Sequence, residues 1–295
     1  MTFDELFAKA TGGAPPYPWQ RRLATAPVMP TRIGIPTGLG KTAGILLAWL
    51  WRRRFADEET RRSTPRRLVY CLPMRVLVEQ TRDSAITYLD RLGLLEGRTE
   101  RIAVSALMGG EPDGGWDLYP ERDAILVGTQ DMLLSRALNR GYGMSRYRWP
   151  MHFGLLNSDC LWVVDEVQLL GAGLATTTQL QAFRRLLGTH GQASTAWMSA
   201  TMAPEWLETF DVDLGLDAPG RLELDPDDLE DPEVARRMKA DKPLRSASAR
   251  MDESKALAEE ILAAHRPGTR TLVVMNTVQR AIELHAALVK SSPAA

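Results

Sequence analysis

The sequence contains little of the chemistry that marks secreted, zinc-binding or membrane proteins. Only two of its 295 residues are cysteines, Cys71 and Cys160, and its four histidines are scattered, so that no metal-ligand spacing is present. Two isolated thiols within apolar stretches are typical of core residues in a reducing cytoplasm rather than of a disulfide framework. The longest apolar run, Thr42 to Trp51, is too short to cross a membrane, and residues 1–10 are acidic and amphipathic, unlike a signal peptide. We therefore expect a cytoplasmic protein without a membrane partner.

The chain also has almost no excess of either charge, but the two signs are unevenly spread. Its net charge is −1, yet residues 1–200 hold 24 Lys and Arg against 19 Asp and Glu, whereas residues 201–295 hold 12 against 18. The basic excess of the first part permits a nucleic-acid groove without requiring one. The densest clusters, at residues 52–54, 61–62 and 66–67, fit such a groove or, more simply, a solvated helix end and linker.

The most informative feature that is present is the run Pro36-Thr-Gly-Leu-Gly-Lys-Thr42, which lies between a short expected strand and an apolar helix. Its two glycines lack a Cβ, so the backbone can turn tightly around a phosphate and aim N–H groups at the phosphate oxygens. The helix adds the positive end of its dipole, Lys41 adds a charge for the β- and γ-phosphates, and the Thr42 hydroxyl can reach a metal ion. One position departs from the usual spacing, because Ile35 stands where a small residue is expected. The run predicts a nucleoside triphosphate site.

A second motif carries the acids that such a site needs. Residues 160–164 form a continuous apolar run, as in a strand buried on both faces of a parallel sheet, and Asp165 and Glu166 follow it. Ligands of open parallel sheets bind at the carboxyl ends of the strands. Asp165 is therefore placed to hold Mg²⁺, and Glu166 to polarise an attacking water. Together the two motifs predict that the chain binds a nucleoside triphosphate with Mg²⁺ and hydrolyses it.

Strand and helix patterns alternate and predict a doubly wound parallel α/β domain over residues 1–210. The expected strands are 31–35, 67–72, 102–107, 124–128, 160–164 and 194–199. The expected helices are 43–51, 76–92, 131–138 and 174–187, with a Gly- and aromatic-rich loop over 141–150. Residues 211–250 are acidic and Pro-rich and are expected to form an irregular connector. The start of a second α/β domain is expected over 251–295, with elements at 252–264 (helix), 270–275 (strand) and 277–289 (helix).

Short blocks at the expected strand ends extend the pattern. Four of them each follow a strand, at 72–75, 109–110, 128–131 and 199–201, and Tyr17-Pro-Trp-Gln-Arg21 precedes the phosphate loop. Each block alone is ordinary turn chemistry. In their order and spacing, however, they resemble the motifs of superfamily 2 helicases.

Within that superfamily the chain looks most like the CRISPR-associated helicase of type I systems. The closest parallels are Pro36–Thr42, Leu72-Pro-Met-Arg-Val-Leu-Val-Glu-Gln80, Val127-Gly-Thr-Gln-Asp-Met-Leu-Leu134, Val164-Asp-Glu-Val-Gln168, Met198-Ser-Ala-Thr201 and Val274-Met-Asn-Thr-Val-Gln-Arg280. The Asp-Glu-Val-Gln form departs from the more frequent Asp-Glu-Val-His and indicates a divergent subtype. The resemblance implies a RecA-like P-loop fold and an ATP-dependent DNA helicase or translocase motor. It also implies single-stranded DNA, a Cascade-type interference complex and a nuclease domain or subunit outside this chain as partners.

The resemblance further implies two sets of contacts. ATP and Mg²⁺ would be held by residues around the phosphate loop and the two acids: Tyr17, Gln20, Thr37, Gly38, Leu39, Gly40, Lys41, Thr42, Asp165, Glu166 and Gln168. In this set Gln20 would read the adenine edge, and Tyr17 or Trp19 would stack on the base. A second set of residues would line the DNA track and contact its phosphates: Arg75, Gly109, Gly110, Thr129 and Gln130. Hydrolysis would be coupled to movement of the DNA through Ser199 and Thr201.

The family's motor also needs parts that residues 1–295 do not contain. Its arginine fingers come from a complete second domain, of which only one expected strand and helix are present, and its metal-dependent nuclease domain is missing. We therefore expect the front part of a longer protein, or a truncated product, that turns over ATP poorly by itself. Two alternatives stay open: the motor subunit of another superfamily 2 system, such as a restriction-type translocase, and a module that binds nucleotide and DNA without turnover.

Overall fold

The computed structural model describes residues 1–95, 102–109, 115–201, 203–209, 212–213, 220–240 and 242–291. The chain forms two compact units, Met1–Lys239 and Ala240–Ala295, which we call the first unit and the second unit. Across the described residues, no helix combines the length and the apolar character that crossing a membrane requires.

A parallel seven-stranded sheet forms the centre of the first unit. Its order is β3-β4-β2-β5-β6-β1-β9, and all of its pairings are parallel. The strands are β1 (Arg32–Gly34), β2 (Arg67–Leu72), β3 (Ala103–Leu107), β4 (Ala124–Thr129), β5 (Cys160–Asp165), β6 (Ala193–Ser199) and β9 (Arg221–Glu223). Every residue of β2 and β5 is buried, as their unbroken apolar runs predict. Because the strands are parallel, the loops that follow them meet at one edge of the sheet.

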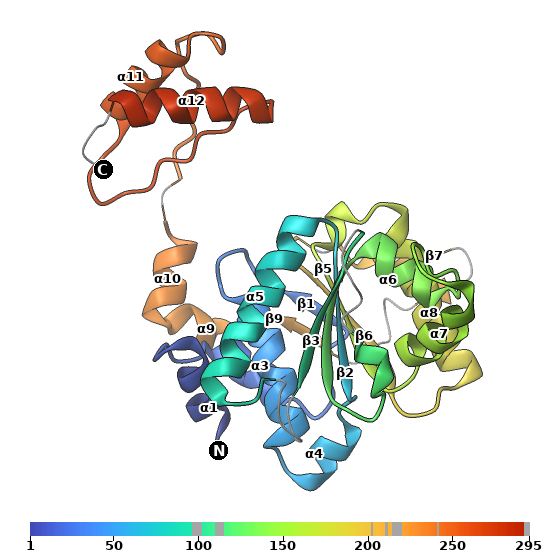
Figure 1. Ribbon diagram of the computed structural model, residues 1–295. Coiled ribbons are helices and arrows are strands. Elements are labelled where there is room, and N and C mark those ends of the chain that lie inside the picture. Colours follow the sequence, from blue (N-terminus) through green and yellow to red (C-terminus); the bar gives the residue numbers. More distant parts are fainter. Residues whose placement is uncertain are drawn as a thin grey trace. The chain divides into compact units, whose positions relative to one another are not determined.

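Helices cover both faces of this sheet (Figure 1). One face carries α1 (Phe3–Thr11), α3 (Lys41–Arg54) and α5 (Arg75–Leu92), and the other carries α6 (Gln130–Ala137), α7 (Trp149–Asn157) and α8 (Ala172–Leu187). Side chains of β2 alternate between two cores, since Leu68 and Tyr70 join the first and Val69 and Cys71 the second. The predicted doubly wound α/β fold is confirmed.

One expected loop contains a helix. The Gly- and aromatic-rich segment 141–150 leads through a 3₁₀ turn, Arg146–Arg148, into α7, which begins at Trp149. Pro150 occupies the first turn of α7, where the missing N–H of proline costs no hydrogen bond. The aromatic and proline residues therefore start a helix rather than only a loop.

The expected connector over 211–250 also contains regular structure. After the antiparallel pair β7 (Glu208–Thr209) and β8 (Val212–Asp213), β9 pairs with β1 as the seventh strand, and α9 (Pro226–Glu230) and α10 (Pro232–Met238) follow. The side chains of Asp225 and Asp231 accept hydrogen bonds from backbone N–H groups in the first turns of these helices. The Asp-Pro pairs are thus helix caps with proline in the first turn, so the compact unit continues beyond residue 210 to Lys239.

The second unit is small. Its helices, α11 (Ser254–Ala264) and α12 (Val278–Ser291), pack through Leu257, Ala258 and Leu284. The strand expected at 270–275 is wrong, because these residues are irregular and pair with no strand in the described part of the chain. Their apolar residues favour a strand, but a strand requires a neighbour for its backbone hydrogen bonds.

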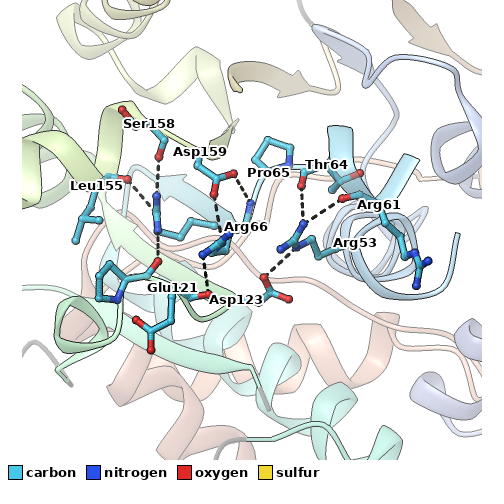
Figure 2. A network of polar contacts seen from close by, with 12 residues as sticks. Arg53, Arg61, Thr64, Pro65, Arg66, Glu121, Asp123, Leu155, Ser158 and Asp159 are labelled. Atoms are coloured by element: carbon cyan, nitrogen blue, oxygen red, sulfur yellow. Dashed lines mark hydrogen bonds and ion pairs between the residues drawn. The ribbon is translucent and has the colours of Figure 1, made fainter. Parts of the chain in front are cut away.

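The basic clusters at 52–54 and 66–67 lie at the edge of the first unit where the strands begin, and each contains one buried arginine, Arg52 or Arg67. Figure 2 shows Arg53 donating to Asp123 and Arg66 contacting Asp159. Arg67 is 5% exposed and donates to the carbonyls of Pro120, Leu155 and Ser158. The interpretation as a solvated helix end and linker is therefore wrong for Arg52 and Arg67, whose guanidinium groups satisfy carbonyls of the fold, whereas the other three arginines are partly exposed and pair with carboxylates.

Candidate functional site

The phosphate loop follows β1 at the carboxyl edge of the sheet. Gly38 and Gly40 have φ angles of 87° and 71°, in the left-handed region that glycine adopts without strain. Gly40 is the N-cap of α3 and gives it no side-chain cap. Leu39 is fully buried between the two exposed glycines, so its side chain anchors the loop and only its backbone can face a ligand. The loop thus presents exposed backbone at a helix N-terminus, as anion binding requires.

Lys41 directly follows this loop as the first residue of α3, and its ammonium group is placed to bind a ligand. Its side chain is 8% exposed, and its Nζ has no hydrogen-bond partner among the described residues. The closest counter-charge is Glu166, with 3.8 Å between Lys41 Nζ and Glu166 Oε1. A buried ammonium group without hydrogen bonds is costly, and phosphate oxygens would satisfy it. The site therefore fits the phosphates that the sequence predicts.

The two acids stand at the end of β5. Asp165 Oδ2 accepts a hydrogen bond of 2.9 Å from the Tyr70 hydroxyl, and Oδ1 accepts one of 2.8 Å from the Glu166 N–H. Burial raises the pKa of Asp165 to about 6, although the charge of Lys41 opposes that rise. The Thr42 side chain lies near the same Tyr70 hydroxyl and opposes the rise of its pKa. Two oxygen-bearing side chains therefore converge beside the phosphate loop, in a donor set that suits Mg²⁺.

Glu166 is held out of the strand by an uncommon backbone conformation. Its φ is 52°, in the left-handed region that non-glycine residues rarely adopt. The side chain is oriented by Gln168, whose Nε2 donates to Glu166 Oε2 at 2.6 Å. Such strain is typical of functional positions, where surrounding contacts fix it.

Gln168 links the acids to the end of β6. Its Oε1 accepts a hydrogen bond of 2.8 Å from the Ser199 hydroxyl, which in turn accepts one of 3.1 Å from the Thr201 N–H. The residues predicted for nucleotide contact and for coupling thus form one continuous chain of polar contacts, from Lys41 through Glu166 to Thr201.

On the other side of the loop, α2 (Pro18–Thr25) and its N-cap Tyr17 carry the residues predicted for the base. Gln20 Oε1 accepts a hydrogen bond from the Tyr17 N–H, and Gln20 Nε2 donates to the Gly40 carbonyl at 3.0 Å. Tyr17 is half-buried and remains available for stacking. Trp19 is fully buried, and a Cβ on Gly44 would come within 2.6 Å of its ring. Trp19 is therefore excluded as a stacking residue, because it packs under α3.

The residues predicted for DNA lie along the same edge but on its other half. Arg75 follows β2, Gly109 follows β3, and Thr129 and Gln130 stand at the junction of β4 and α6, whereas Gly110 lies outside the described residues. The sheet order places these three strands on one side of β5, and it places β6, which ends at the coupling residue Ser199, and β1, which leads into the phosphate loop, on the other. The structure therefore separates the two predicted sets, with the acids between them.

Sequence reasoning missed Tyr70. Its hydroxyl donates a hydrogen bond to Asp165, and burial, with the Asp165 charge beside it, raises the pKa of Tyr70 well above the ordinary value. The available signal was a tyrosine inside the otherwise apolar run of β2, since a buried hydroxyl needs a partner.

Comparison with solved structures shows the same fold in helicases. The crystal structure of the DUF1998 helicase MrfA aligns with 98% of this chain at a TM-score of 0.59 and 18% identity, and its DNA-bound structure aligns with 97% at 0.60 and 17%. A variant of Dbp5 from S. cerevisiae, bound to Gle1 and IP6, aligns with 98% at 0.59 and 18%. The alignments cover 41% and 39% of the two MrfA chains and 66% of the Dbp5 chain, so this chain spans about two fifths of MrfA.

No curated protein matches the sequence. The family model for DEAD/DEAH box helicases does match it, over residues 21–210, and so covers more than half of the chain. That range includes the phosphate loop, both acids and the Ser199–Thr201 block. The chain therefore belongs to the DEAD/DEAH box helicase family, whose members are ATP-dependent helicases of superfamily 2.

Proposed function

We propose that this chain is the ATP-binding part of a DNA motor that hydrolyses ATP with Mg²⁺ to move along single-stranded DNA. The observation that carries the proposal is the buried Lys41 ammonium, which has no hydrogen bond among the described residues and lies under a glycine loop beside two acids. This geometry supports a ligand that brings several anionic oxygens. A triphosphate does so.

Each residue of the site has a distinct part in this proposal. The backbone from Thr37 to Gly40 and the Lys41 ammonium bind the phosphates, while Thr42 and Asp165 hold Mg²⁺. When bound, Mg²⁺ neutralises charge on the β- and γ-phosphates. Glu166, oriented by Gln168, positions the attacking water and accepts its proton.

Substitution of Lys41 tests nucleotide binding. In calorimetry with ATP and Mg²⁺, Lys41→Ala should lose at least about 10-fold in affinity, because charge-assisted hydrogen bonds contribute about 1.5–3 kcal/mol each. Lys9→Ala, at the exposed end of α1, removes the same charge away from the site and should bind like wild type. Melting temperatures without nucleotide check that both variants are folded. Equal ATP affinity in wild type and Lys41→Ala would refute the proposal.

The finer assignment, to the motor of a CRISPR interference system, rests on the motif resemblance of the sequence. Under this assignment a Cascade-type complex loaded with target DNA should stimulate ATP hydrolysis more than the same concentration of free single-stranded DNA. Stimulation by free DNA alone would favour another superfamily 2 translocase. Binding of ATP and DNA without turnover, also in a longer chain, would favour the binding module.

We also propose that residues 251–295 open a second motor domain. Support comes from the alignment of 98% of this chain with MrfA, which covers both units. Arginines of that domain would complete the catalytic site, and their loss typically lowers turnover about 10³-fold or more. Steady-state ATPase assays of this chain beside one that carries the complete second domain, both with saturating single-stranded DNA, measure the difference. Equal kcat values would contradict it.

A further inference from the structure

The residues at the end of β9 and in α9 form ion pairs and a hydrogen bond with α2, the helix at whose start the residues predicted for the base lie. Arg22 of α2 contacts Asp225 Oδ2 and Asp228 Oδ2, each at 2.7 Å, and donates to the Glu223 carbonyl at 2.7 Å. Asp228 is fully buried. Charge pairs with a buried partner and several hydrogen bonds hold their geometry well. The position of α9, and of α10 directly after it, is therefore fixed relative to Tyr17 and Gln20.

From this position α10 reaches the phosphate loop. Arg237 Nη1 donates a hydrogen bond to the Gly38 carbonyl, and the Arg237 guanidinium carbon lies 6.0 Å from the centre of the Tyr17 ring. The carboxylate of Glu233 is 4.0 Å from Arg237 Nε, and the Arg237 side chain is 45% exposed. A planar cation thus stands between the phosphate loop and the aromatic ring predicted for the base, on an element outside the helicase motifs.

Building on the proposed nucleotide site, we infer that Arg237 binds the nucleotide base and stacks on the face opposite Tyr17. Stacked planes lie ~3.4 Å apart, so a base between two planes needs a separation of about 7 Å. The existing 6.0 Å differs from this by about the movement that a flexible arginine side chain allows. Guanidinium groups and tyrosine rings both stack well on nucleobases. The hydrogen bond to the Gly38 carbonyl orients the guanidinium group.

The test separates the base from the phosphates. ATP and tripolyphosphate, each with Mg²⁺, are titrated by calorimetry into wild type, Arg237→Ala and Arg237→Lys. Arg237→Ala should weaken ATP about 5- to 30-fold, the range of one stacking contact, and leave tripolyphosphate unchanged. Arg237→Lys should not restore ATP affinity, because an ammonium group keeps the charge but not the plane. Arg236→Ala removes the same charge from the same helix, where Arg236 pairs with Glu233 at 2.7 Å, and should bind ATP like wild type.

Three results would overturn the inference. Unchanged ATP affinity in Arg237→Ala would show that Arg237 makes no contact. An equal loss for ATP and tripolyphosphate would show that it binds phosphate instead. Tighter ATP binding would show that the Arg237 side chain obstructs the nucleotide site. The proposed function fails separately, if Lys41→Ala keeps wild-type affinity. If Lys41→Ala loses ATP and Arg237→Ala does not, only the stacking role is wrong.

Discussion

Replacement of Asp165 by asparagine should stabilise the empty protein, and by an amount that depends on pH. The side chain is 5% exposed, and burial raises its pKa from 3.8 to about 6. Ionisation is therefore easier in the unfolded chain than in the folded one. An asparagine of the same shape can accept from the Glu166 N–H and donate to the Tyr70 oxygen, so it keeps both contacts without the buried charge.

The sign and size of the effect follow from linkage. Below the unfolded pKa the carboxyl is neutral in both states and costs nothing, and the cost grows as pH rises through the folded pKa. A shift from 3.8 to about 6 corresponds to about 3 kcal/mol, since each pKa unit equals about 1.4 kcal/mol. The free energy of unfolding of Asp165→Asn should thus exceed that of wild type by about 3 kcal/mol at about pH 8, and by less than about 1 kcal/mol at about pH 4.

Urea unfolding with a metal chelator present measures this difference across pH. All eight tryptophans lie within Met1–Lys239, so tryptophan fluorescence reports on the first unit alone. Fluorescence of wild type and variant is followed at several values between about pH 4 and pH 8. A stability difference that does not change with pH, or a variant less stable at high pH, would show that the Asp165 charge is not desolvated in the empty site.

Three further predictions concern turnover, packing and DNA. Glu166→Gln should lower kcat strongly in a chain with the complete second domain while leaving ATP affinity nearly intact, and unchanged kcat would assign the catalytic acid elsewhere. Gly44→Ala should destabilise the first unit by ~1–3 kcal/mol, because the added Cβ would come within 2.6 Å of the Trp19 ring. The control Gly154→Ala adds a Cβ with no atom within 4 Å and should be neutral or stabilising, so equal melting temperatures of the two variants would contradict this prediction. Single-stranded DNA affinity should fall steeply with salt and vary little with sequence in fluorescence anisotropy, so salt-independent binding would exclude a phosphate-dominated contact.

The sequence predicts those parts of the site that local backbone chemistry determines. Glycines at 38 and 40 and the apolar run before Asp165 carry their own conformational preferences, so the loop, the strand and their edge follow without tertiary information. The alternation of strand and helix patterns, which predicts a doubly wound sheet, also follows from local sequence preferences. The partners of a side chain are different, because they depend on which distant segments the fold brings together.

Trp19 and Arg67 illustrate that limit. An aromatic residue before a phosphate loop can stack on a base or fill a core, and only the packing of Trp19 against Gly44 decides between them. Adjacent arginines can likewise face solvent or bind carbonyls, and Arg67 finds its three carbonyls in two other segments of the chain. The Asp-Pro pairs of α9 and α10 are a different case. Asp followed by Pro is a helix-start signal that the sequence contains, but the segment was predicted to be an irregular connector.

The pairing of β1 has a consequence for synthesis of the protein on the ribosome. This strand is three residues long, and both of its neighbours come much later in the chain, since Gly34 pairs with Ser199 on one side and with Glu223 on the other. Contacts of such long sequence separation form late, so β1 has no strand to pair with until those later segments have been synthesised. The phosphate loop therefore acquires its support only after β9 has left the exit tunnel, so a nascent chain should gain affinity for ATP near the end of translation of the first unit.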